Sequence, residues 1–231
     1  MKTRIIMAFG AAIAMLIQVQ TSPAALTGSL NGGNPITIGD KTFSNFGYVA
    51  SGADENELAA DALDLNISAK INGGVYYLDW SGLIAANNLG GATPLLGDLQ
   101  LTYTVTANSG LISMIDQNYT PNALPATGQI IIGETVQMPG GAIVANSTLT
   151  LTPTDLSDPA PEAGDNLFVN PNQPVLNVTK DILIDADAGQ LVGLSDVEQS
   201  FHQVAVPEPM TVTILGLGAL ACFNHLRTKR S

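Results

Sequence analysis

The sequence predicts an all-β protein built as a single antiparallel β-sandwich, with a barrel as the alternative. Three observations predict it. Apolar and polar residues alternate with period two along several runs, as on strands with one buried face. These runs are rich in Thr, Val, Ile and Tyr, which favour strands, and turn signals containing Gly or Asn separate them. Many short strands of this kind predict two sheets packed face to face.

Three strands show the clearest alternation, over residues 63–71, 99–107 and 130–138. A helix would scatter the apolar residues around its axis, whereas a strand places them all on one face. Glu134 is the one polar residue on the apolar side of the third run. The apolar positions are Leu63, Leu65, Ile67, Ala69 and Ile71; Leu99, Leu101, Tyr103, Val105 and Ala107; and Ile130, Ile132, Val136 and Met138.

Weaker patterns predict further strands, separated by turns in which Gly or Asn takes a positive φ at little cost. Two segments do not fit this scheme. Asp54–Asp64 predicts a short helical turn, and the proline-rich, acidic segment Pro153–Pro174 predicts a long surface excursion. The weaker strands are Thr42–Val49, Val75–Trp80, Ser147–Leu151, Val175–Ile184 and Val197–Val204, and the turn signals are Gly39-Asp40, Asn72-Gly73-Gly74, Asn108-Ser109-Gly110, Pro139-Gly140-Gly141 and Asp187-Ala188-Gly189.

The middle of the chain is strongly acidic. Residues 25–206 contain three lysines and nineteen acids, a net charge of −16. Binding to nucleic acid requires Lys or Arg to displace counterions from the phosphates, so this charge excludes nucleic acid as a partner. The single cysteine, Cys222, lies in the C-terminal apolar stretch, so the predicted domain has no disulfide and no thiolate for catalysis or metal binding.

Residues 1–24 are predicted to form a secretory signal peptide. Lys2 and Arg4 give a positive start, Ile5–Val19 is apolar, and Ser22-Pro23-Ala24 is a small-x-small site with cleavage after Ala24, or alternatively after Ala25. The alternative is an uncleaved membrane anchor. It is disfavoured because the apolar run of about 15 residues is shorter than the ~20 that a spanning helix needs.

The C-terminal segment, 206–231, has three parts. Val206-Pro207-Glu208-Pro209 comes first, the apolar stretch Met210–Phe223 second, and a basic end with Arg227, Lys229 and Arg230 last. The prolines hold an extended segment open to a protease, and the basic residues stay on the cytoplasmic side. Fourteen apolar residues give about 21 Å of helix against a hydrocarbon core of ~30 Å, which predicts a short, transient transmembrane helix. The proline pair and the basic end disfavour a buried strand or helix.

This order resembles the PEP-CTERM sorting signal of Gram-negative bacteria, with Pro207, Glu208 and Pro209 as its motif. The resemblance covers about the last 25 residues. It implies that the general secretion machinery exports the chain and that exosortase, a membrane-embedded cysteine transpeptidase, processes it at the inner membrane. It also implies a cell-surface or extracellular-matrix location. A weaker resemblance extends upstream, where 177–182, a turn at 187–190 and 197–201 look like the hairpin that precedes such tails.

Two acidic patterns are candidate calcium sites. Asp185, Asp187 and Asp196 have the spacing of a calcium loop, but Gln190 stands where that loop requires glycine. A solvated hairpin turn is the favoured interpretation. The second pattern is the acidic cluster Asp54, Glu55, Glu57, Asp61 and Asp64, which is favoured as a solvated face. The sequence predicts no metal and no cofactor.

The sequence predicts no catalytic residues. His202 has no signalled partner, and the chain has neither a Gly-x-Ser-x-Gly elbow nor a His-Glu-x-x-His helix. Trp80, with Tyr76 and Tyr77, is a candidate sugar-stacking platform, although an aromatic layer in the core is favoured. We expect an exported surface or matrix protein with a structural or interaction role, not an enzyme. The alternatives are a carbohydrate-binding module, with extracellular polysaccharide as partner, and an extracellular hydrolase.

Overall fold

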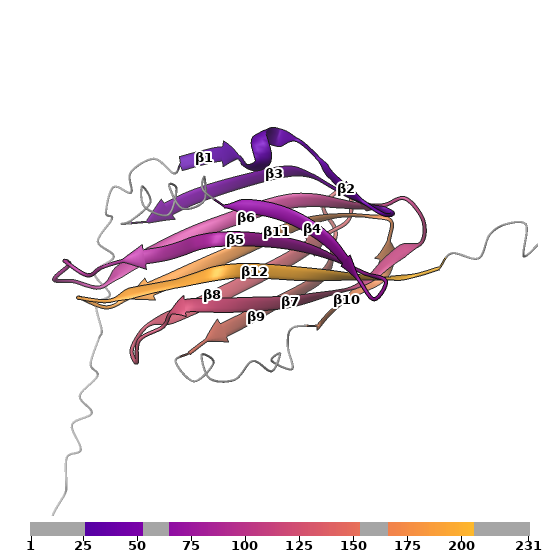
Figure 1. The fold of residues 1–231 in the computed structure, drawn as a ribbon. Coiled ribbons are helices and arrows are strands. Elements are labelled where there is room, and N and C mark those ends of the chain that lie inside the picture. The colour runs from indigo at the N-terminus through magenta and orange to yellow at the C-terminus, as the bar shows by residue number, and fades with distance from the viewer. Residues whose placement is uncertain (1–25, 53–64, 153–165, 206–231) are drawn as a thin grey trace, which may run out of the picture.

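The computed structural model describes residues 26–52, 65–152 and 166–205, which form twelve strands and one short 3-10 helix (Figure 1). The all-β prediction is confirmed for these residues. The elements are β1 (Leu26–Ser29), η1 (Leu30–Gly33), β2 (Ile36–Ile38), β3 (Lys41–Gly52), β4 (Asn66–Asn72), β5 (Val75–Asn87), β6 (Leu95–Ala107), β7 (Leu111–Ala123), β8 (Gln129–Gln137), β9 (Ile143–Leu151), β10 (Asn166–Gln173), β11 (Val175–Ala186) and β12 (Leu191–Val204).

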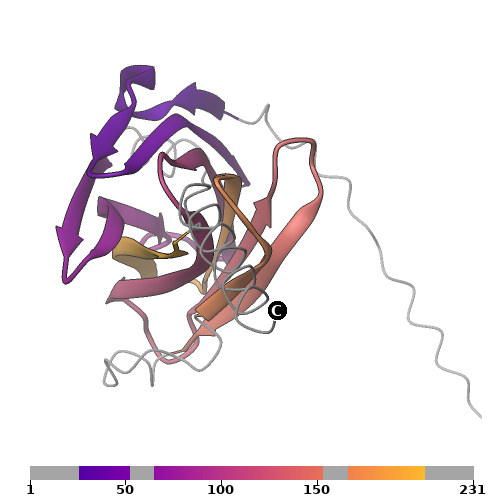
Figure 2. The ribbon, with the colours of Figure 1, turned by 90° about the vertical axis from the view of Figure 1, so that its right-hand side faces the viewer.

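The strands form two antiparallel sheets. The seven-stranded sheet has the order β1-β3-β6-β11-β8-β9, with β2 paired to β3, and the five-stranded sheet has the order β10-β7-β12-β5-β4. Figure 2 looks along the strands, which surround a common interior. The sheets are separate and do not close into one, so the arrangement is sandwich-like and the barrel alternative is wrong.

The core consists of inward-facing residues from both sheets. All five predicted apolar positions of 99–107 are buried, as are Ile130, Ile132 and Val136 in β8. Aromatic rings join the sheets: the ring centroids of Phe43 and Phe201 are 5.2 Å apart, and Trp80 meets Tyr103 edge-on at 5.2 Å. Trp80 is only 1% exposed, so it belongs to an aromatic core layer and is not a surface platform for sugar.

Four of the strands, β1, β2, β7 and β10, go beyond the sequence prediction. β10 lies inside the segment Pro153–Pro174, which was expected to be a surface excursion, so that prediction is wrong for Asn166–Gln173. As an edge strand, β10 tolerates Pro171 because it needs ladder hydrogen bonds on one side only. β7 was not predicted at all. In the predicted strand 63–71, Ile71 beside the β4–β5 turn is 46% exposed rather than buried.

β11 and β12 do not form the hairpin that the upstream resemblance implies. β11 lies between β6 and β8 in the seven-stranded sheet, and β12 lies between β7 and β5 in the five-stranded sheet. The turn between them, closed by the Gln190 N–H donating to the Asp187 carbonyl at 3.1 Å, therefore crosses from one sheet to the other. Both strands are central in their sheets, and their inward side chains meet in the interior.

Candidate functional site

The residues of the predicted sorting and cleavage signals lie outside the described part of the chain. They are Ala24, Pro207, Glu208, Pro209, Arg227, Lys229 and Arg230. The same holds for the acidic cluster and the helical turn expected within 53–64. Within residues 26–52, 65–152 and 166–205, no helix has the length and apolar character needed to cross a membrane.

The structure does not bring the three aspartates of the candidate calcium loop together. Asp187 lies in the turn that crosses between the sheets, whereas the Asp196 side chain faces Asp79 of β5. Among the described residues, no group of three or more His, Cys, Asp or Glu side chains is placed to hold a metal. His202 is a partly exposed residue of β12, with its Nε2 3.2 Å from the Ser200 hydroxyl.

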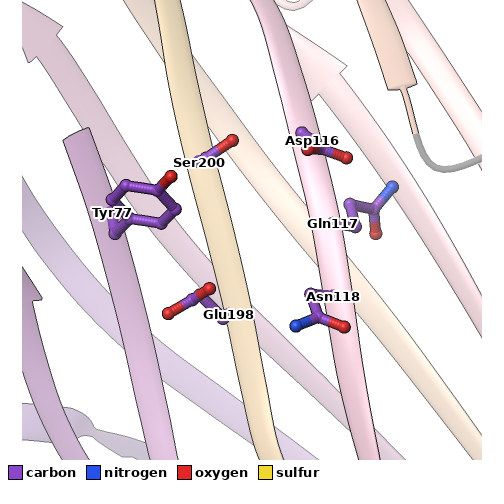
Figure 3. A pocket seen from close by; sticks show the side chains of 6 residues that line it. All are labelled: Tyr77, Asp116, Gln117, Asn118, Glu198 and Ser200. Atoms are coloured by element: carbon purple, nitrogen blue, oxygen red, sulfur yellow. The ribbon is translucent and has the colours of Figure 1, made fainter. Parts of the chain in front are cut away.

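A small hollow lies on the five-stranded sheet over β5, β12 and β7 (Figure 3). Its volume of about 30 Å³ is close to that of a single water molecule, whereas pockets for small organic ligands enclose hundreds of cubic ångströms. This hollow therefore gives no support to a sugar-binding or substrate-binding role. Its lining residues are Tyr77, Asp116, Gln117, Asn118, Glu198 and Ser200.

Two carboxyl pairs lie between neighbouring strands, one in each sheet. Burial, together with the hydrogen bond and charge of Asp79, raises the pKa of Asp196 to about 7. Burial and the neighbouring Asp181 raise the pKa of Asp98 to about 6 in the same way. Among the described residues, Oδ1 of Asp79 and Oδ1 of Asp98 are buried without a hydrogen-bond partner. Protonation of a pair at a pH below its raised pKa supplies a donor that the ionised pair lacks.

The most unusual feature of the interior is a set of polar side chains between the sheets, which we call the central polar cluster. Lys180 of β11 stands directly opposite Glu134 of β8, and Gln199 of β12 stands opposite Gln117 of β7. These four residues are at most 1% exposed, although Lys and Glu are almost never fully buried unless paired. The cluster comprises Tyr103, Gln117, Tyr119, Glu134, Lys180 and Gln199.

Lys180 uses all three of its ammonium hydrogens in the cluster. Its Nζ lies 2.5 Å from Glu134 Oε2, 2.8 Å from Gln117 Oε1 and 2.7 Å from the Tyr119 hydroxyl. The Tyr119 hydroxyl in turn donates to Gln117 Oε1, and Gln117 Nε2 donates to the Ser147 hydroxyl at 2.9 Å. The carboxamide of Gln117 is therefore held at both ends, with two donors on its carbonyl oxygen.

Glu134 is held from its other side by Gln199. Gln199 Nε2 lies 2.9 Å from Oε1 and 2.7 Å from Oε2 of Glu134, and Gln199 Oε1 accepts the Tyr103 hydroxyl at 2.5 Å. Complete burial, with the charge of Glu134 as a smaller cause, holds the pKa of Tyr103 well above its usual range. Tyr103 therefore stays a neutral donor. A network with its buried groups bonded in this way avoids the cost of unpaired buried polar atoms.

A second buried lysine, Lys41, lies at the start of β3. Its Nζ is 2.7 Å from Asp40 Oδ1, donates to Gln203 Oε1, and lies 4.2 Å from the centre of the Tyr76 ring. Burial opposes the charged form of Asp40, but hydrogen bonds from Lys41, Tyr76 and Ser109 outweigh it and lower the pKa of Asp40. Unlike the central polar cluster, this site has an exposed glutamine.

The central polar cluster combines an amine, a carboxylate and a carboxamide in a space closed to water, which is the set of groups that acyl transfer to an amine requires. The cluster was not predicted from the sequence. The available signals were Glu134 on the apolar side of its strand and Lys180 among the alternating apolar residues of Val175–Ile184. No protein-family model matches this chain, and no curated protein matches it.

Proposed function

We propose that this protein is an exported cell-surface or extracellular-matrix protein with a structural or interaction role, sorted and processed by exosortase. The observation that carries the proposal is the order of the C-terminal segment: Pro207-Glu208-Pro209, then the apolar stretch Met210–Phe223, then a basic end. The N-terminal segment ending at Ala24 supports export by the general secretion route. The mature domain is a sandwich that starts after Ala24 and ends before the tail.

The position of the sorting segment relative to the fold fits this role. β12 ends at Val204, only two residues before Val206-Pro207-Glu208-Pro209. β12 pairs with β7 on one side and with β5 on the other, so ladder hydrogen bonds hold it on both edges. A domain tethered through a central strand resists being peeled apart by a pull on its C-terminus, because both ladders must break together.

The proposal is tested with the full chain in a strain that contains exosortase and in the same strain without it. We expect loss of the segment beyond Pro209 only in the first strain, measured by intact mass, and release or surface location of the shortened protein. A matched variant with Pro207 and Pro209 replaced by alanine keeps the apolar stretch and the basic end, and should keep its full C-terminus in both strains.

An identical C-terminus in the two strains would overturn the sorting proposal. Removal of the tail in the strain without exosortase would also overturn it, because another protease would then be responsible. Retention of residues 1–24 in the intact mass would overturn the proposed signal peptide separately from the C-terminal proposal.

A further inference from the structure

We propose that the central polar cluster forms a covalent isopeptide cross-link between Lys180 Nζ and the side-chain carbonyl carbon of Gln117, with Glu134 as the residue that moves the protons. This modification joins β11 of the seven-stranded sheet to β7 of the five-stranded sheet. It is independent of the proposed sorting by exosortase, because none of the three residues lies in the sorting segment.

The geometry places the reacting groups in contact. Lys180 Nζ is 2.8 Å from the carbonyl oxygen of the Gln117 side chain and 2.5 Å from Glu134 Oε2. Groups held at such distances react as if at very high concentration, since no further freedom is lost on approach. The Tyr119 hydroxyl also donates to Gln117 Oε1, where negative charge develops during attack on the carbonyl.

The reaction balances without an oxidant, reductant or cofactor. Glu134 takes one proton from the Lys180 ammonium, and the resulting amine attacks the side-chain carbonyl carbon of Gln117 while the carbonyl electron pair moves to Oε1. The electron pair then returns, the bond to Nε2 breaks, and the protons lost by Nζ pass through Glu134 to the departing nitrogen. One amide replaces another, and one ammonium ion leaves.

Burial favours this reaction and protects its product. Lys180, Glu134 and Gln117 are at most 1% exposed, so water does not compete with the amine for the carbonyl carbon. With a single cysteine in the chain, an internal disulfide is not available to an exported domain, whereas this cross-link needs no cysteine.

The second buried lysine provides a control within the same molecule. Lys41 also donates to a glutamine carbonyl and contacts a carboxylate, but Gln203 is exposed and water can reach its carboxamide. Among the described residues, no tyrosine hydroxyl is bonded to the Gln203 carbonyl as Tyr119 is to Gln117. We therefore expect Lys41 and Gln203 to stay unlinked.

The test is peptide mapping of the full-length protein after denaturation and cleavage at glutamates. Such cleavage places Gln117 in fragment 58–134 and Lys180 in fragment 163–198. We expect these fragments to appear as one branched species, lighter than their sum by one ammonia, with the branch located at Gln117 and Lys180 by fragmentation. In the Glu134→Gln and Lys180→Arg variants, no branched species should form. Fragments containing Lys41 and Gln203 should appear separately.

Separate fragments of full mass from the folded wild-type protein, with folding verified by circular dichroism, would overturn the proposal and leave a permanent ion pair. A branched species that had lost water rather than ammonia would also overturn it, because the lysine would then be joined to a carboxyl group such as Glu134. The wild-type measurement decides the question even where a variant does not fold.

Discussion

Lys180 and Lys41 are both completely buried, and each contacts a carboxylate, a glutamine and a tyrosine ring, yet they differ in their access to water. The partner of Lys180, Glu134, has a side chain with no exposed surface. The partner of Lys41, Asp40, is 16% exposed, and Gln203 and Ser109 beside it are exposed. The first site is sealed between the sheets, whereas the second lies at the rim of the interior.

This difference shows that the same three kinds of group have different consequences in different surroundings. At the rim, water can replace a lost partner, so the ion pair contributes to stability as an ordinary charged hydrogen bond. In the sealed centre, water cannot do so, and removal of one partner leaves an unpaired charge in an apolar interior. The same exclusion of water makes the central site the one suited to covalent chemistry.

The largest expected effect is that of removing Glu134. We expect Glu134→Ala to lower the free energy of unfolding by roughly 3–5 kcal/mol, because Lys180 is left buried without its carboxylate. The matched change at the rim, Asp40→Ala, should cost roughly 1.5–3 kcal/mol, because Lys41 keeps Gln203 and the Tyr76 ring. Urea unfolding of both variants at neutral pH measures the difference, and loss of the proposed cross-link would add to it.

Equal losses at the two sites would contradict the comparison, because access to water would then not distinguish them. A double variant that replaces both charged side chains with apolar side chains of similar volume provides the control. In Glu134→Leu with Lys180→Met, both charges are removed together, so the part of the loss that comes from the unpaired charge should be recovered, whereas the contribution of the proposed cross-link should not.

The strands were predictable where most inward positions are apolar. In β6, Leu99, Tyr103 and Val105 are all buried, and alternation alone identified the strand. β7 escaped prediction because Gln117 and Tyr119 occupy inward positions and interrupt the apolar set. In β3, Phe43 and Phe46 are both buried although three residues apart, because the register shifts between Ser44 and Gly47. A single irregularity therefore weakened the alternation there.

The central polar cluster was only partly predictable. Alternation places Glu134 and Lys180 on the inward sides of their strands, so a buried charge at each position follows from the sequence. Their pairing does not follow, because it requires β8 and β11 to be neighbours although the two residues are 46 positions apart. The turn between β11 and β12 looks like a hairpin signal in the sequence, but the chain crosses there from one sheet to the other. The contact between Lys180 and Gln117, which lie in different sheets, therefore could not be predicted from the sequence either.

The Asp79 and Asp196 pair extends the comparison because two acids face each other there, and the charge of Lys70 is only a smaller, opposing influence. The pKa of Asp196 is raised from 3.8 to about 7, so the folded state binds a proton that the unfolded chain releases. The stability from this proton is complete below about pH 4 and is lost as pH rises towards about 7. Asp196→Asn should therefore stabilise the protein by roughly 1 kcal/mol at pH 8, a value reduced for partial exposure, and by less at pH 5.

Urea unfolding of the wild type and of Asp196→Asn between pH 4 and 8 measures this effect. The variant of the other pair, Asp98→Asn, is the matched control. The pKa of Asp98 is raised only to about 6, so its gain should appear at a lower pH and be smaller. Parallel stability curves for Asp196→Asn and the wild type across this range would show that the two aspartates do not share a proton.

The smallest effect is expected at Lys70, the third lysine of the described residues. Lys70 of β4 contacts Glu198 of β12 across the intervening strand β5, but its side chain is 54% exposed. An ion pair open to water and salt contributes little, so Lys70→Gln should change the free energy of unfolding by less than about 1 kcal/mol. The charge of Lys70 lowers the pKa of Asp196, so the variant should also shift the Asp196 titration to higher pH, measurable by NMR of its carboxyl carbon. A stability loss as large as that of Glu134→Ala would show that burial does not set the order of the three lysines.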